Sequence, residues 1–112
     1  MMIAIPVSGE KLSAHFGRCE SFALIEVDDE SRQVKSMNWI QAPPHQPGLL
    51  PQWLRERGVT AVIAGGMGPR AQQLLAQLGI HAVIGAPEVA PEQLVADYLA
   101  GQLKTSQNPC DH

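Results

Sequence analysis

Short apolar runs alternate with polar turns along the chain, and they predict strands buried in a sheet. Residues 34–40 mix apolar with polar side chains, which is typical of an edge strand. The short polar turn 28–31 predicts that the strands on either side of it form an antiparallel hairpin. The runs that predict strands are residues 2–7, 22–27 and 34–40, and those within 58–65 and 79–85.

Helical periodicity is clearest after the sequence Ala61-Val-Ile-Ala-Gly65-Gly-Met-Gly68. Four apolar residues recur there at i, i+3, i+4 and i+7 and form one helical face: Ala71, Leu74, Leu75 and Leu78. Pro69 suits the first turn of this helix, and Gly79 suits the left-handed position that ends it. Two further helices are predicted over residues 49–57 and 91–100.

The order β-β-β-α-β-α-β-α predicts one α/β domain with a five-stranded mixed sheet and helices on both faces. The fourth strand should lie parallel to the first, with the fifth beyond it and the hairpin on the other side. Loops 8–21, 41–49, 65–69 and 85–90 should then meet at one sheet edge, where open α/β sheets bind ligands. We assign residues 1–103 to this domain and residues 104–112 to a polar tail.

Composition narrows the possible functions. The chain has 112 residues and a net charge of −3, so it lacks the basic excess that nucleic-acid binding requires. No apolar run approaches the roughly 20 residues of a membrane span, and we expect a cytoplasmic protein. Two cysteines do not make a disulfide framework, and in a reducing compartment they are more plausible as ligands or reactive groups.

Soft and borderline metal donors gather at the predicted ligand edge: His15, Cys19, His45 and Met67. Thiolate, imidazole and thioether groups suit copper, zinc, iron–sulfur or molybdenum–sulfur species rather than magnesium. Each also has a purely structural interpretation, because His15 can brace its loop, His45 can be plain surface, and Cys19 and Met67 can pack in the core. His81 falls at the other end of its strand and is interpreted as structural.

The glycine-rich turn is a second candidate. Gly65, Gly66 and Gly68 precede a helix N-terminus, where outward amides favour anions. The turn matches neither the G-x-G-x-x-G dinucleotide fingerprint nor a phosphate loop, so a tight turn without a ligand is an equal alternative.

The tail is the third candidate, because Cys110 and His112 place a thiol and an imidazole two residues apart. Short tracts of this kind can chelate a divalent metal, whereas terminal segments are often simply disordered. Since ten residues span up to roughly 33 Å when extended, the tail can return to the ligand edge or cross to a second copy.

Catalysis has little support in the sequence. Ribonuclease H-like nucleases need carboxylates on the central strands to hold magnesium, and the predicted first and fourth strands have none. A Ser/His/Asp set with a nucleophile elbow is also missing, so we expect a non-catalytic protein.

Three ordered motifs resemble the dinitrogenase iron–molybdenum cofactor-binding (biosynthesis accessory) family. They are Ile3-Ala-Ile-Pro-Val7, Ser13-x-His15-Phe16-Gly17-Arg18-x-x-x-Phe22 and Ala61-Val-Ile-Ala-Gly65-Gly-Met-Gly68. The resemblance implies a ribonuclease H-like domain that binds or carries a metal–sulfur cluster similar to the iron–molybdenum cofactor. The chain departs from the family in the loop after the third strand, where prolines and only His45 replace several histidines and glycines. This departure gives more weight to Cys19 and the tail.

These observations define a candidate site and three hypotheses. The cofactor-binding candidates are His15, Phe16, Gly17, Arg18, Cys19, His45, Gly65, Gly66, Met67 and Gly68, and the metal candidates are His15, Cys19, His45, Cys110 and His112. The leading hypothesis is a cluster carrier that meets a donor or acceptor protein. The second is a zinc, nickel or copper site built by Cys110 and His112, with His45 as a further candidate ligand. The third is a regulatory or interaction module that holds an anion in the glycine turn and can dimerise through residues 34–40.

Overall fold

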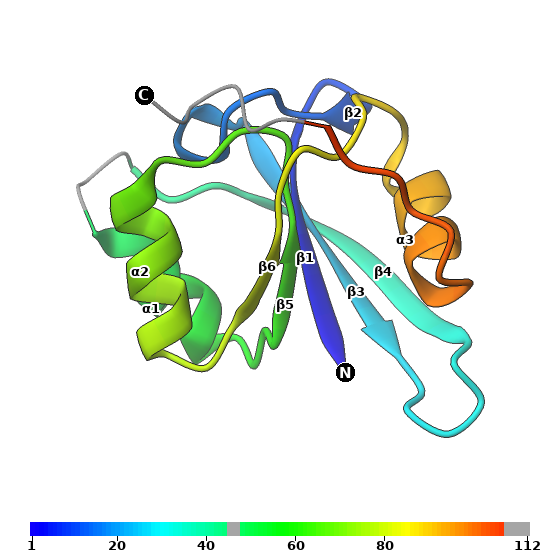
Figure 1. The fold of residues 1–112 in the computed structure, drawn as a ribbon. Helices are drawn as coiled ribbons and strands as arrows, with labels where there is room; N and C mark the ends of the chain where they lie inside the picture. Colours follow the sequence, from blue (N-terminus) through cyan, green and yellow to red (C-terminus); the bar gives the residue numbers. More distant parts are fainter. Residues whose placement is uncertain (45–47, 107–112) are drawn as a thin grey trace.

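The computed structural model describes residues 1–44 and 48–106, and it forms a sheet covered by helices on both faces (Figure 1). The strands are β1 (Met2–Ser8), β2 (Lys11–Leu12), β3 (Ser21–Val27), β4 (Val34–Gln41), β5 (Ala61–Ile63) and β6 (His81–Val83). The helices are the 3-10 helix η1 (Phe16–Arg18) and the α-helices α1 (Leu49–Glu56), α2 (Pro69–Gln77) and α3 (Pro91–Leu99).

The main path of the sheet has the strand order β4-β3-β1-β5-β6. β1 pairs antiparallel with β3 and parallel with β5, and β6 continues the parallel part. The predicted order of the five strands and their mixed directions are therefore confirmed. The arrangement is compatible with a ribonuclease H-like topology, and β1 and β5 contain no carboxylate.

The loop predicted over residues 8–21 contains more structure than expected. Gly9 has a φ of +69°, which turns the chain so that β2 pairs with the end of β1. Leu12 is then buried and secures the two-residue strand. The five predicted strands form the main path of the sheet, and β2 is an addition that is too short to carry a periodic pattern.

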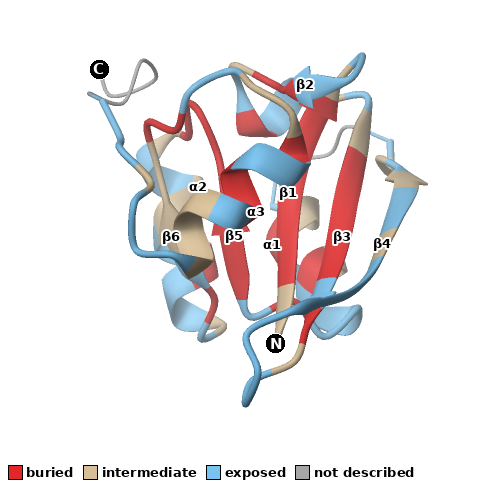
Figure 2. Ribbon diagram, turned by 90° about the vertical axis from the view of Figure 1, so that its right-hand side faces the viewer, coloured by how far each residue is buried: buried red, intermediate tan, exposed pale blue. Residues whose placement is uncertain are grey.

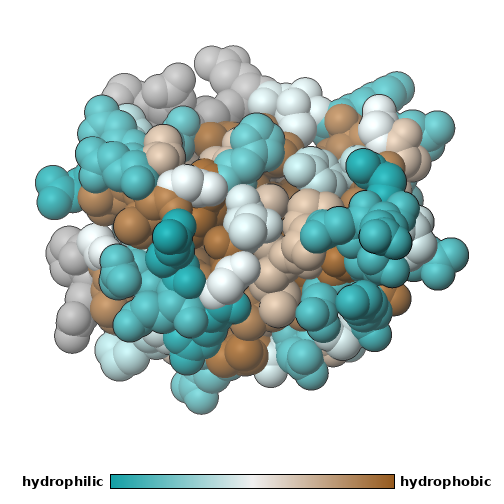
Figure 3. All heavy atoms as spheres, turned by 90° about the horizontal axis from the view of Figure 1, so that it is seen from below, coloured by the Kyte–Doolittle hydropathy of each residue, from teal (hydrophilic) through white to brown (hydrophobic). Residues whose placement is uncertain are grey.

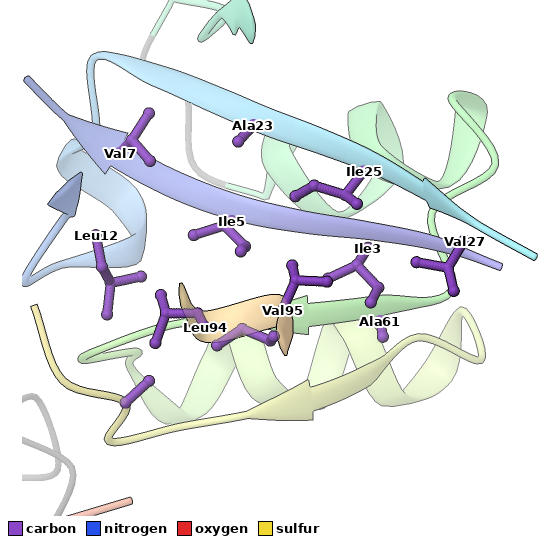
Figure 4. Packing of buried hydrophobic residues seen from close by; sticks show 12 residues of the cluster. Ile3, Ile5, Val7, Leu12, Ala23, Ile25, Val27, Ala61, Leu94 and Val95 are labelled. Atoms are coloured by element: carbon purple, nitrogen blue, oxygen red, sulfur yellow. The ribbon is translucent and has the colours of Figure 1, made fainter. Parts of the chain in front are cut away.

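Two apolar clusters lie on opposite faces of the sheet because side chains alternate along β1. Ile3, Ile5 and Val7 belong to the cluster under α3, together with Leu94 and Val95 of that helix (Figure 4). The cluster under α1 and α2 contains Ala4, Phe22, Leu24, Val62, Leu54 and Leu75. Complete burial of a large apolar side chain contributes roughly 1.5–3 kcal/mol, so these two layers hold the strands in register.

The two ends of the sheet differ in what they carry. Loops that follow β1, β5 and β6 lie together at the upper edge in Figure 1, where the parallel strands have their carboxyl ends. The view of the opposite end shows hydrophilic side chains with apolar atoms between them (Figure 3).

The edge strand β4 is the most exposed strand, and Trp39 retains 46% of its accessible surface (Figure 2). Within the described residues, no helix is long and apolar enough to cross a membrane.

Candidate functional site

Backbone hydrogen bonds join three loops into one rim at the carboxyl edge of the sheet. His15 and Gly66 form a parallel β-bridge, in which the Phe16 N–H donates to the Gly66 carbonyl at 2.9 Å. The Gly66 N–H donates to the Ala14 carbonyl at 2.7 Å, and the Gly85 N–H donates to the Gly65 carbonyl at 2.7 Å. The predicted meeting of the loops after β1, β5 and β6 is confirmed.

The turn η1 separates its side chains into two sets. In a 3-10 helix side chains three residues apart lie on the same side. Accordingly His15 and Arg18 are both exposed, whereas Phe16 is buried and Cys19 is half-buried against the same apolar cluster. His15 and Cys19 therefore face different surroundings, and Phe16 is a core residue that holds the loop to the sheet. Its ring packs edge-on against Phe22, with centroids 6.0 Å apart.

Cys19 lies in a hollow of about 300 Å³ between its own loop and the segment after β4. Ala42 and Pro43 border this hollow, so the fourth predicted loop also reaches the rim. Burial raises the pKa of the Cys19 thiol to about 11, and a backbone hydrogen bond only partly offsets the rise. The thiol is therefore protonated at neutral pH. It becomes a metal ligand only when the incoming metal displaces the proton.

Charge in this hollow comes from two exposed side chains. Arg18 and Glu20 both line it, and Arg18 forms no ion pair within the described residues. The sequence interpretation included Arg18 and overlooked Glu20, which directly follows Cys19. An anion bound in this hollow would be attracted by the charge of Arg18 and repelled by the charge of Glu20.

The glycine turn differs from its prediction. Gly65 and Gly66 are buried, and the Gly66 amide is bonded to the Ala14 carbonyl, so the expectation that it faces a ligand is wrong. The physical reason is that the loop containing Ala14 occupies the position beside the glycines where a ligand was expected. Met67 retains 1% of its accessible surface and packs in the core. Gly68, the N-cap of α2, differs from Gly65 in that a Cβ there would meet nothing within 4 Å.

The remaining predicted ligands fall elsewhere. His45, Cys110 and His112 lie outside the described residues. Among the described residues, 1–44 and 48–106, no group of three or more His, Cys, Asp or Glu side chains is placed to hold a metal ion. His81 is exposed at the start of β6, away from the rim, as predicted.

Gly85 and Ser106 belong to the rim and were not singled out from the sequence. The Ser106 N–H donates to the Gly85 carbonyl at 2.7 Å, so the chain after α3 returns to the carboxyl edge (Figure 1). The sequence did contain a signal for Gly85, because the pattern G-[VI]-x-A-V-I occurs twice and a glycine follows each copy. Gly85 comes directly after the second copy, and Gly65 follows the first copy after one intervening residue, Ala64.

Fold and rim together define a small α/β domain whose loops form one continuous edge at the carboxyl ends of its parallel strands. The chain belongs to the dinitrogenase iron-molybdenum cofactor family, whose model matches residues 1–101. An uncharacterized protein of Methanocaldococcus jannaschii, MJ0580, is 33% identical over 107 residues, which cover 93% of this chain and 90% of that protein.

Solved structures share the architecture. The crystal structure of PH0822 superposes with a TM-score of 0.87 at 28% identity and covers 95% of both chains. The apo form of the orange protein from Desulfovibrio gigas gives a TM-score of 0.74 at 24% identity, covering 96% of this chain and 94% of that one. At this identity the second likeness shows the shared fold.

Proposed function

We propose that this protein binds an anionic metal–sulfur cluster, similar to the iron–molybdenum cofactor, at the rim and carries it without converting it. Family membership supports the class of cargo. The observation that carries the location is the His15–Gly66 bridge, which fixes an exposed imidazole beside the turn that leads into α2.

Three features of the rim suit such a cargo. Arg18 lies three residues after His15 on the exposed side of η1 and can form charge-assisted hydrogen bonds to cluster sulfides. The first N–H groups of α2 lack partners within the helix and favour negative charge. Imidazole and thiol groups are ligands that iron and other transition metals accept.

Cys19 supplies a second, weaker anchor. Its thiol has to lose a proton before it can bind metal, and its high pKa makes that loss costly at neutral pH. A cargo held by the imidazole and the guanidinium on the exposed side of η1, with the thiol of Cys19 on the half-buried side adding little, is held loosely. Loose binding suits a protein that receives a cluster from a donor protein and passes it to an acceptor protein.

Anaerobic reconstitution tests the proposal. The full chain is incubated with iron, molybdate and sulfide, desalted, and measured for metal content and charge-transfer absorbance. We expect retained metal and absorbance in the natural chain and a clear loss of both in His15→Ala. His81→Ala removes an exposed histidine away from the rim and serves as the matched control. Equal retention in His15→Ala and His81→Ala would refute the proposed location.

A further inference from the structure

A second hollow lies on the face of the sheet that α3 covers, where the start of α3, the turn before β2 and the strand β4 approach one another. It measures about 330 Å³ and is lined by Glu10, Lys11, Trp39, Ala90 and Glu92. Trp39 is on this face because it pairs with Ala23, which is buried in the cluster under α3. Its indole therefore forms an aromatic wall in a hollow whose other side chains are mostly charged.

The charge in this hollow is negative. Glu10 and Glu92 are exposed and form no ion pair within the described residues, whereas Lys11 is the one basic residue among the lining residues. Glu92 belongs to a long stretch, residues 71–103, that contains neither lysine nor arginine. Two carboxylates beside a tryptophan favour an organic cation, because the face of an indole also attracts positive charge.

The strand β4 offers backbone groups beside the hollow. In the described part of the chain, β3 pairs with one side of β4 and no strand pairs with the other. Figure 2 shows β4 at the side of the sheet that α3 leaves uncovered. An extended segment can add to such an edge through main-chain hydrogen bonds, and every second side chain then lies on the face of Trp39. The residue opposite Trp39 would have its Cβ about 5 Å away, so a long basic side chain there can lie over the indole.

We propose that this surface, which consists of the hollow and the outer edge of β4, binds an extended basic segment of another protein. An arginine of that segment lies over Trp39 and beside Glu10 and Glu92. Arginine suits the position better than lysine, because its planar guanidinium stacks on aromatic rings and bonds carboxylates through two N–H groups. Tryptophan and arginine are also the residues that most often dominate the binding energy of protein interfaces.

A second copy of this chain is the competing occupant of the surface. It suits the surface less well, because the chain has a net charge of −3 and pairing would bring two acidic molecules together. The surface uses neither His15 nor Cys19, so its occupant does not depend on the proposed cluster site.

Fluorescence polarisation tests the surface with a labelled peptide of alternating serine and arginine residues and the full chain at low micromolar concentration. We expect saturable binding of this peptide and much weaker binding of the same peptide with glutamine in place of arginine. Trp39→Ala should weaken binding about tenfold or more. Glu92→Gln should weaken it about two- to fivefold and Lys11→Gln should strengthen it by about the same factor, since exposed charges contribute modestly. These two exposed changes keep the test independent of any effect of Trp39→Ala on folding.

Glu56→Gln is the matched control, because it makes the same charge change as Glu92→Gln at an exposed position on α1. It should leave binding nearly unchanged, and equal losses in the two variants would overturn the site, since only net charge would then matter. Equal binding of the glutamine peptide would overturn the role of arginine. Binding of N-acetylarginine amide as tight as that of the peptide would also overturn the proposal, because the hollow would then take a small organic cation without the edge of β4.

Equilibrium sedimentation decides between the basic segment and a second copy. Because both use the outer edge of β4, excess arginine peptide should convert any dimer of the chain to monomer. A dimer that persists with the peptide present in excess would assign the edge to the second copy and overturn the proposal.

Discussion

Gly65 lies directly beneath the backbone of Ser13. A Cβ added at residue 65 would lie 3.2 Å from the Ser13 carbonyl oxygen and 3.3 Å from the Ala14 carbonyl oxygen. Both neighbours are backbone atoms in a loop that is bonded to Gly66 and cannot move aside freely. The glycine-rich turn is therefore shaped by the loop that carries His15.

Gly65→Ala should accordingly destabilise the protein by about 1–3 kcal/mol and displace the loop that presents His15. Gly68→Ala is the matched control, because a Cβ there meets nothing within 4 Å and its φ of −67° suits any residue. Urea unfolding measures the difference in free energy of unfolding between the two variants. Equal free energies of unfolding would show that residue 65 accommodates a Cβ, contrary to the close contacts in the structure.

Arg18 and Glu20 should affect cluster binding in opposite directions. Arg18→Gln removes a charge-assisted interaction and should weaken binding about tenfold, whereas Glu20→Gln should strengthen it by roughly two- to fivefold. Lys35→Gln on β4 makes the same charge change as Arg18→Gln on another surface and controls for net charge. Equilibrium binding at low and high salt measures all three variants. Identical effects of Arg18→Gln and Lys35→Gln would mean that only net charge matters.

Cys19 should react slowly with alkylating agents. Because burial raises its pKa to about 11, the thiolate fraction at neutral pH is roughly 100-fold below that of an ordinary cysteine. A Cys110→Ser background isolates Cys19, and the same chain unfolded in urea gives the reference rate. Iodoacetamide should label the folded chain far more slowly than the unfolded chain. Similar rates would contradict the buried position of the thiol.

The same pKa sets a pH dependence for any metal bound by Cys19. Below about pH 11 the metal must displace one proton, so the apparent affinity should rise by up to about tenfold per pH unit between about pH 7 and about pH 9. Cys19→Ser removes the thiol and should flatten this slope. A slope that is the same in both chains would assign the released proton to another group.

The sequence predicted the strand order and the rim because both follow from long apolar runs and the rules for crossover connections. It did not predict which partners the polar backbone groups of the rim bind, or which of its side chains turn inward. Gly66 binds the chain's own loop, and Phe16 turns inward, since contacts between segments far apart in sequence decide both. Gly85 was missed for the same reason, because the residue that needs its small size is Ser106, twenty-one positions later.

The exposed edge strand β4 leads to the last prediction, self-association. Val34 and Trp39 retain 48% and 46% of their accessible surface, and β4 has no neighbour on its outer side in the described part of the chain. Antiparallel pairing of two β4 strands centred on Asn38 would set Trp39 opposite the partner's Met37 on the face under α3, and aromatic–methionine contacts are favourable.

Trp39→Lys should abolish this dimer, because it removes the apolar contact and places a charge on the edge strand. Gln73→Lys, an exposed position on α2, adds the same charge on another surface and should leave the dimer intact. Equilibrium sedimentation at tens of micromolar distinguishes these outcomes. A natural chain that sediments as a monomer at that concentration would contradict the predicted dimer. A dimer that persists in Trp39→Lys would show that the interface does not lie on β4.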